Sequence, residues 1–116
     1  MKRGEIWWAV LPRPRASERA SRRGYRRPVL IVQSDAFNRS RIRTVVGVVL
    51  TSNMRLADAP GNVALAPRES GLPKPSVANV SQVVTLDKSY LSERVSTIAK
   101  RRMHAVEEGL RLVLSY

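Results

Sequence analysis

Only the last stretch of this chain carries a sustained helical period. From Ala99 onward, the apolar residues Met103, Val106, Leu110 and Val113 are spaced three, four and three apart, which places them on one face of a helix. The segments before it are short apolar runs bounded by glycine, proline or polar residues, a pattern typical of strands and turns. The chain is thereby restricted to a sheet that is closed by one C-terminal helix.

The strand-like runs are numerous and short. The residue pattern predicts strands at 4–12, 28–34, 44–52, 62–66, 76–84 and 94–98, with connections at 13–27, 53–61 and 67–75. Most connections are short enough for hairpins, which favours antiparallel pairing in a strongly curved sheet or small barrel. We therefore predict a single domain over residues 1–116, mainly β, with a small barrel of five to six mostly antiparallel strands and a C-terminal helix.

Two glycines inside these elements point to close packing. Gly47 interrupts a valine-rich strand, where glycine marks a bulge or the close approach of another segment. Gly109 lies in mid-helix, where glycine costs about 1 kcal/mol relative to alanine. The helix can tolerate it if another backbone comes close there, and a two-fold axis of a homodimer would supply one.

The charge of the chain determines the class of partner to expect. Twenty-one Lys and Arg stand against nine Asp and Glu, for a net charge of +12 at pH 7. Such a field attracts polyanions, nucleic acid first, and then acidic proteins or membrane surfaces. No apolar run approaches the roughly 20 residues of a membrane span, and the N-terminus lacks a signal-peptide pattern. We expect a cytoplasmic protein that does not enter the membrane.

No metal ion or other cofactor is expected. The sequence has no cysteine and a single histidine, His104, on the polar side of the final helix, so the ligands of a transition-metal site are missing. The carboxylates are few and scattered, unlike the paired acids of a two-metal nuclease. No phosphate-binding GxxxxGK[ST] motif occurs. Any transfer or hydrolysis by this chain is expected to be metal-free.

The densest positive charge lies in residues 13–27, at the mouth of an apolar strand. This segment carries seven arginines and one glutamate with no amphipathic period, and it is expected to form a long loop. Within it, Arg22, Arg23 and Arg26 are placed on the loop. Arg27 differs because Pro28 follows it.

Arg27 is the arginine that local structure holds in place. A residue before proline is driven to extended geometry, and Pro28 suits the first position of a strand. A guanidinium fixed in this way can hold a phosphate through two parallel hydrogen bonds. The alternative is a structural ion pair, for example to Asp35 or Asp87.

Polar residues also follow the valine-rich strand. Thr51 and Ser52 end it, and Asn53 begins the next connection. Hydroxyl groups at the exit of a strand are well placed to bind a phosphate oxygen, although the same residues are ordinary turn formers.

Taken in order, these segments resemble the MazF/PemK (Kid) toxin family along essentially the full chain. The resemblance rests on KRGEIWWAVLP near the start and Ser17-Glu18 in the basic segment, followed by RPVLIVQ at 27–33, VVLTSN at 48–53 and NVSQVVTLDK at 79–88. The individual motifs are common, and the ordered set is specific.

The resemblance implies a toxin of a type II toxin–antitoxin pair. Members are homodimers of a small SH3-like barrel, the CcdB/MazF type, with an appended helix. They are mRNA interferases, endoribonucleases that cut single-stranded RNA without metal, often at a short specific sequence, and so inhibit translation and growth. A cognate MazE-like antitoxin with an acidic tail neutralises them, which suits a basic groove on the toxin.

By the same resemblance the catalytic residues fall on Arg27, Thr51 and Glu18. The 2′-hydroxyl of RNA would attack the adjacent phosphate, giving a 2′,3′-cyclic phosphate and a 5′-hydroxyl, with Arg27 stabilising the phosphorane. Thr51 would orient the phosphate or pass a proton, and Glu18 would act as a base or order the loop. Binding of RNA is expected from Arg22, Arg23, Tyr25, Arg26, Gln33, Ser52, Asn53 and Gln82.

Two other functions are compatible with the residue pattern. A CcdB-like toxin shares the fold but binds gyrase, and it would need neither Arg27 nor Thr51. A non-catalytic basic barrel would bind RNA and DNA alike in a salt-dependent manner. The arginine-rich segment and the TSN strand end favour the nuclease.

Overall fold

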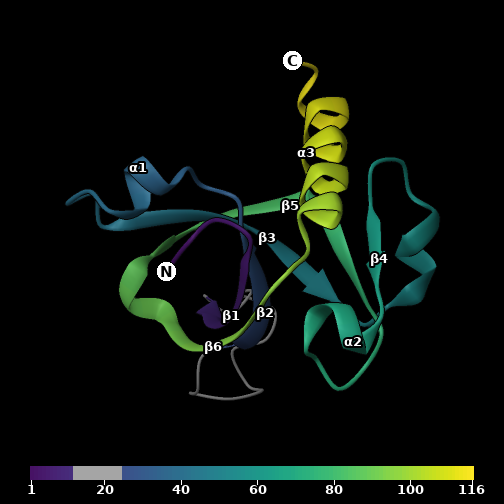
Figure 1. Ribbon diagram of the computed structural model, residues 1–116, viewed down its shortest axis with the longest axis horizontal. Helices are drawn as coiled ribbons and strands as arrows, with labels where there is room; N and C mark the ends of the chain where they lie inside the picture. Colours follow the sequence, from purple (N-terminus) through teal and green to yellow (C-terminus); the bar gives the residue numbers. More distant parts are fainter. Residues whose placement is uncertain (12–24) are drawn as a thin grey trace.

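An antiparallel sheet in the order β4-β5-β3-β2-β1-β6 forms the body of the molecule (Figure 1). The computed structural model describes residues 1–11 and 25–116. In this part of the chain the strands are β1 (Glu5–Leu11), β2 (Tyr25–Ile31), β3 (Thr44–Thr51), β4 (Val63–Leu65), β5 (Ser76–Asp87) and β6 (Leu91–Thr97). Between them lie the short helices α1 (Asp35–Asn38), η2 (Met54–Asp58), α2 (Pro67–Ser70) and η3 (Lys88–Tyr90), and α3 (Lys100–Leu114) ends the chain.

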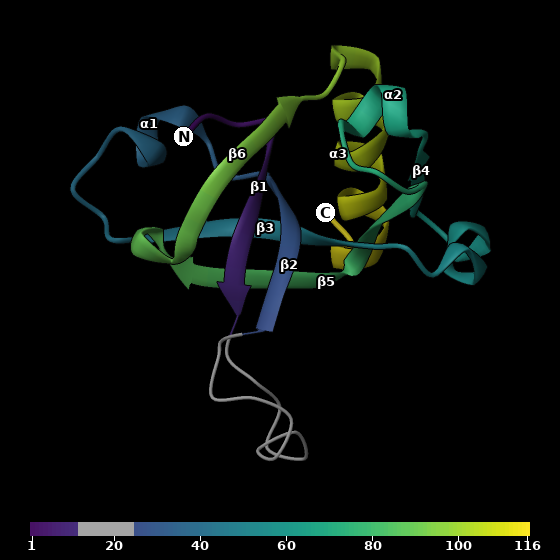
Figure 2. The same ribbon diagram turned by 90° about the horizontal axis from the view of Figure 1, so that it is seen from below.

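The sheet is strongly twisted and curls into a half-barrel. Strands β6, β1 and β2 run across the direction of β3 and β5 in Figure 2. Strand β5 bends where its register with β3 shifts, because Val48 faces Val83 whereas Leu50 faces Ala78. Extra residues on one strand increase the local twist. The predicted architecture, a mainly antiparallel curled sheet with a C-terminal helix, is confirmed.

Apolar residues cover both faces of the sheet. On one face, Ile6 of β1 packs with residues of α3, and Trp8 lies against the same cluster. On the other face, Ala9 and Leu11 pack within the curl of the sheet, with Trp7 against them. Alternation along β1 therefore divides its side chains between two cores, one tryptophan to each, as the period-two pattern predicts.

Helix α3 packs its apolar face against the sheet and is held there by a contact between two glycines. Met103, Val106 and Leu110 are buried as predicted, whereas Val113 is 42% exposed, because the helix extends past the sheet. A Cβ added at Gly109 would overlap the carbonyl oxygen of Gly61. The backbone that approaches Gly109 thus belongs to the same chain, and the two-fold axis is not needed to explain this glycine.

Several predicted boundaries need correction. Strand β2 begins at Tyr25, so residues 25–27 belong to a strand and not to a loop, and Pro28 is its fourth residue. Proline is tolerated there because the pairing of β2 with β3 starts only at Val29. The connections 53–61 and 67–75 contain η2 and α2, and β5 continues to Asp87. The close approach expected at Gly47 is confirmed, since a Cβ there would overlap Val29.

No helix in the described residues is long and apolar enough to cross a membrane.

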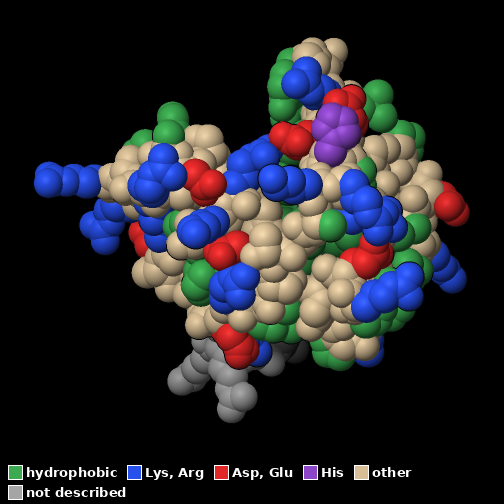
Figure 3. Space-filling view, viewed as in Figure 1, with side chains coloured by type: hydrophobic (Ala, Val, Ile, Leu, Met, Phe, Trp, Pro, Cys, Tyr) green, Lys and Arg blue, Asp and Glu red, His purple; other side chains and the backbone are tan. Residues whose placement is uncertain are grey.

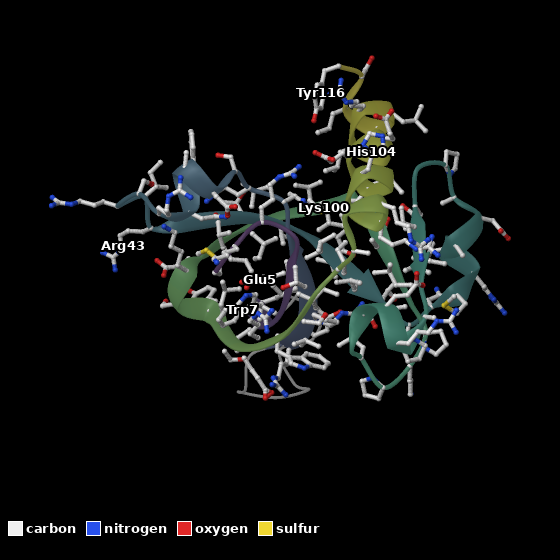
Figure 4. All side chains as sticks on the ribbon, in the orientation of Figure 1. Glu5, Trp7, Arg43, Lys100, His104 and Tyr116 are labelled. Carbon is white, nitrogen blue, oxygen red and sulfur yellow. The ribbon has the colours of Figure 1, made fainter. Side chains whose placement is uncertain are left out.

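The N-terminal strand is anchored by a buried carboxylate, Glu5, which lies beside Trp7 (Figure 4). Glu5 accepts hydrogen bonds from the backbone N–H of Lys2 (2.7 Å), the indole N–H of Trp7 (3.0 Å) and Nε of Arg94 (2.9 Å). Burial alone would raise the pKa of Glu5. The hydrogen bonds from Trp7, Lys2 and Arg94 outweigh it, so the pKa lies below its ordinary value of 4.5.

Glu5 is therefore expected to make stability depend on pH. A carboxyl whose pKa is lowered in the folded state stabilises the fold above its unfolded pKa. This contribution is lost as the pH falls below 4.5 and through the lowered pKa. In urea unfolding, Glu5→Gln should be less stable than the wild type by about 1 kcal/mol at pH 7. The difference should shrink towards pH 3, and one that stays constant over this range would contradict the assignment.

The Gly61–Gly109 contact can be tested by adding one methyl group. Alanine is the better helix former by about 1 kcal/mol, yet Gly109→Ala should lower the free energy of unfolding by about 1–3 kcal/mol, because the methyl group overlaps the Gly61 backbone. Glu108→Ala, at the exposed neighbouring position, should change it by about 0.5 kcal/mol at most. Urea unfolding at one fixed protein concentration measures both, and a stabilised Gly109→Ala variant would rule out the contact.

Candidate functional site

A cavity of about 320 Å³ opens where β1, β2 and β3 come together with the segment after α2. Its apolar walls come from all three strands and from that segment, and its polar groups are arginine, lysine and serine. The lining residues are Trp8, Arg26, Arg27, Pro28, Leu50, Ser52, Leu72, Pro73, Lys74 and Ser76. No carboxylate is among these lining residues of the described chain. A basic cavity of this kind favours an anionic ligand.

Arg27 is held in β2 and has no acidic partner in the described part of the chain. It faces Ala9 of β1 in the strand register, and its Cζ lies 5.3 Å from the centre of the Tyr25 ring. Its Nε is buried and has no hydrogen-bond partner among the described residues. An ion pair of Arg27 with Asp35 or Asp87 does not occur between these described residues, because the two carboxylates accept from Arg3, Asn38 and Ser89. An unpaired buried donor of this type is costly unless a ligand satisfies it.

Thr51 lies on the same face of the sheet as Arg27, because it follows Val49 by two residues and Arg27 precedes Val29 by two. Val29 and Val49 face each other in the last pair between β2 and β3, and Arg27 and Thr51 lie beyond that pair. Thr51 is buried, and its Oγ1 accepts a hydrogen bond from the backbone N–H of Asn53 (3.1 Å). The hydroxyl hydrogen donates to no acceptor in the described part of the chain. Thr51 is not a lining residue of the cavity, which its neighbours Leu50 and Ser52 line.

Arg26 lies in a strand, not on a loop as predicted. It faces Val10 of β1, and its Cζ lies 4.7 Å from the centre of the Trp8 ring. One guanidinium nitrogen is 3.8 Å from a carboxylate oxygen of Glu93. The prediction failed because the arginine-rich composition of residues 13–27 hides the strand. The missing signal is the pairing with β1, whose register sets Leu11 across from Tyr25.

The other predicted RNA-binding residues are dispersed. Ser52 is exposed and lines the cavity, and Asn53 caps η2 by accepting from the backbone N–H of Arg55 (3.2 Å). The side-chain amide of Gln33 donates to Asn38 (2.9 Å) and to the Thr44 carbonyl (3.2 Å), so it braces the far end of β2. Gln82 is exposed on β5. Neither glutamine lines the cavity. The RNA-binding roles of these residues stay predictions.

Three predicted site residues, Glu18, Arg22 and Arg23, lie outside the described residues. Within the described part, sequence reasoning missed Trp8 as a partner of Arg26, and it missed Lys74 at the cavity. Lys74 lies between Pro73 and Pro75, and this sequence context carries no sign that it shares a cavity with residues of β1 and β2.

Basic side chains also cover the surface away from the cavity. Figure 3 shows Lys and Arg side chains distributed across one face, with a group at the end that carries α1. A second, larger cavity, of about 540 Å³, lies between the N-terminal residues and α3, near Lys100 and His104 (Figure 4). This cavity contains two carboxylates, because Glu107 accepts from Arg3 (2.8 Å) and Asp35 accepts from the backbone N–H of Arg3 (2.8 Å). The cavity beside Arg27 is therefore the better candidate site for an anion.

Comparisons with known sequences agree on one family. Residues 2–114 match the family described as PemK-like, MazF-like toxin of type II toxin–antitoxin system. The chain is 47% identical over 114 residues to endoribonuclease MazF2 of Mycobacterium bovis and to endoribonuclease MazF6 of Mycobacterium tuberculosis, covering 98% of this chain and 96% of each relative. It is 30% identical over 115 residues to endoribonuclease EndoA of Bacillus subtilis, covering 99% and 95%.

Solved structures share the fold. An endoribonuclease from a Mycobacterial species, in complex with its cognate antitoxin, is similar with a TM-score of 0.77 and 25% identity, covering 99% of this chain and 95% of that one. MazF from Deinococcus radiodurans gives a TM-score of 0.75 at 21% identity, covering 100% and 97%, and shows the fold alone.

Together with the family match, the curled antiparallel half-barrel with one C-terminal helix that the chain shares with these structures places it in the class of toxins of toxin–antitoxin systems. The chain belongs to the family of PemK-like, MazF-like toxins of type II toxin–antitoxin systems, whose pattern spans nearly its whole length. The predicted family is thereby confirmed, and the predicted enzyme class agrees with the names of its relatives, which are endoribonucleases.

Because Arg27 has no acidic partner among the described residues, its replacement should affect the free energy of unfolding differently from the replacement of a paired arginine. Arg27→Met keeps the side chain long and removes the unpaired buried Nε, so the free energy of unfolding should stay constant or rise by about 1 kcal/mol. Arg94→Met is the matched control. It deprives the buried Glu5 carboxylate of a partner, and should lower the free energy of unfolding by about 1 kcal/mol. Urea unfolding compares them, and a loss at Arg27 as large as that at Arg94 would show that Arg27 is structural.

Proposed function

We propose that this chain is a sequence-specific endoribonuclease that cleaves single-stranded RNA without a metal ion. The observation that carries the proposal is Arg27, a strand-held cation that lines a carboxylate-free cavity and whose buried Nε is unpaired among the described residues. A phosphate group has the charge and the oxygen atoms to satisfy it. The endoribonuclease relatives support RNA as the source of that phosphate.

The proposed reaction is an internal transfer. The 2′-oxygen attacks the adjacent phosphorus and the bond from phosphorus to the 5′-oxygen breaks, leaving a 2′,3′-cyclic phosphate and a 5′-hydroxyl. The proton lost from the 2′-hydroxyl is balanced by the one that the 5′-oxygen gains. Arg27 stabilises the negative charge that develops on the non-bridging oxygens. Thr51 donates its free hydroxyl hydrogen to the phosphate while its oxygen is held by the N–H of Asn53.

The substrate follows from the same chemistry. DNA lacks the 2′-hydroxyl that attacks, so it would be bound but not cut. Catalysis by a fixed guanidinium and a hydroxyl needs no metal ligand. Glu18 remains a proposed third catalytic residue.

In the cell the proposed role is that of a growth-arresting toxin. The chain would act as a homodimer in the cytoplasm, where cleavage of mRNA stops translation. A cognate MazE-like antitoxin would neutralise it, since its net charge of +12 favours an acidic partner. A similar endoribonuclease has been solved with its cognate antitoxin, which supports this pairing.

The proposal predicts RNA cleavage that survives EDTA and depends on two side chains. Purified protein with excess EDTA should cut mixed-sequence single-stranded RNA at discrete sites with 5′-hydroxyl ends, and leave DNA of the same sequence intact. Arg27→Ala should slow cleavage by about 100- to 1,000-fold, the cost of losing one donor to a developing oxyanion. Thr51→Val, which removes the hydroxyl at constant shape, should also slow it. Mapping the ends of the fragments by sequencing measures both.

Matched variants separate catalysis from charge and shape. Thr51→Ser keeps the hydroxyl and should retain cleavage. Arg41→Ala removes one exposed arginine beyond α1 and should leave the rate within about two-fold. Intact RNA, cuts that disappear with EDTA, or cleavage of the DNA would each defeat the proposal.

A further inference from the structure

The cavity beside Arg27 has the size and walls of a site for one flat group. Its volume of about 320 Å³ lies at the lower end of ligand-binding pockets, which suits a single ring system. Apolar surface from Trp8, Leu50 and Leu72 faces polar groups across the cavity. Bases of single-stranded RNA are commonly bound in this manner, splayed out and stacked.

The side chains that line the cavity offer many hydrogen-bond donors and few acceptors. Arg26, Arg27 and Lys74 carry only hydrogen-bond donors, and no carboxylate or carboxamide side chain lines the cavity. Ser76 donates its hydroxyl to the carbonyl of Lys74 (3.1 Å), which leaves Ser52 as the hydroxyl available to donate or accept. A ligand that presents acceptors is therefore satisfied here, and one that presents donors is not.

Arg26 is the donor that the structure orients. Its guanidinium lies over the Trp8 ring at 4.7 Å from the ring centre, and such a stack fixes the plane in which its N–H groups point. The contact to Glu93 is long, 3.8 Å, and joins two side chains that are 51% and 60% exposed. Exposed pairs of this length are weak, so the N–H groups of Arg26 remain available to a ligand.

We infer that this cavity is a base-recognition pocket in which Arg26, stacked on Trp8, donates hydrogen bonds to the ring carbonyl of guanine or uracil. The inference rests on the proposed function. It specifies which RNA base is bound next to the phosphate held by Arg27, and which residue recognises that base. Guanine and uracil share a carbonyl acceptor beside a ring N–H, which the Ser52 hydroxyl can accept. At the position of that carbonyl, adenine and cytosine carry an amino group. The amino group cannot accept the hydrogen bonds of Arg26, so these donors would stay unpaired.

The first test measures which bases are cut. An RNA pool randomised around one cleavage site is digested by the wild type, by Arg26→Ala and by Arg41→Ala, and the relative kcat/KM of every sequence is obtained by sequencing. In the wild type one position should favour guanine or uracil over adenine and cytosine by about 10- to 100-fold. Arg26→Ala should reduce that ratio to within about three-fold and leave the preferences at other positions intact. Arg41→Ala, with the same loss of charge, should keep the ratio.

A second test does not depend on cleavage. The indole N–H signals of Trp8 and Trp7 are followed by NMR while GMP, UMP, AMP or CMP is added, with Trp7→Phe used to assign them. Trp7 packs on the opposite face of β1 and is the internal control. GMP and UMP should shift the Trp8 signal at concentrations about ten-fold lower than AMP and CMP, and this difference should vanish in Arg26→Ala.

The outcomes separate the two proposals. RNA that is cut with the same base preference in the wild type and in Arg26→Ala would overturn the pocket and leave the proposed function standing. A wild type that cuts no RNA would overturn the proposed function, and the NMR titration would still decide the pocket. Equal shifts of Trp8 with all four mononucleotides, or none, would overturn the pocket.

Discussion

The register between β1 and β2 determines where each charged group of the candidate site lies. Ala9 faces Arg27 and Val10 faces Arg26, so the two neighbouring arginines leave β2 on opposite sides, at the end of the strand where β3 no longer pairs with it and where the cavity is lined by both. Arg27 lies over the Tyr25 ring, and Arg26 stacks on Trp8. Because side chains alternate with a period of two, a slip by one residue would exchange the two arginines. The buried apolar residues on both faces of β1 make such a slip costly.

The acidic residues are used elsewhere in the structure, and this leaves the cavity basic. Glu69 accepts from the backbone N–H of Ala66 and from Arg102, and these bonds hold its pKa below the ordinary value. Glu5 is engaged by Arg94 at the N-terminal strand. Carboxylates thus join α2 to α3 and β1 to β6, while the arginines of β2 are spared strong ion pairs among the described residues. The same few acids support the fold and keep the site open to an anion.

The architecture could be predicted from the sequence because the patterns that indicate strands, helices and turns are local. Strand alternation, the helical period and the breakers locate the six strands and α3. Arg27 was identified by the proline after it, a short-range constraint. The failures concern pairing between distant segments. The start of β2 depends on its register with β1, the partner of Gly109 is Gly61, and the amide of Gln33 is bound by α1 and β3. The amino-acid composition of a short stretch of sequence carries no information on contacts between distant residues.

The contact between Gly61 and Gly109 means that two positions distant in the sequence limit each other's substitutions. Gly61 adopts a left-handed φ of +84°, and its carbonyl occupies the space that a side chain at Gly109 would need. A larger residue can therefore be accepted at position 109 only if the turn at position 61 moves as well. In family members in which the C-terminal helix lies farther from the turn before β4, substitutions at these two positions should therefore occur together, as a covarying pair.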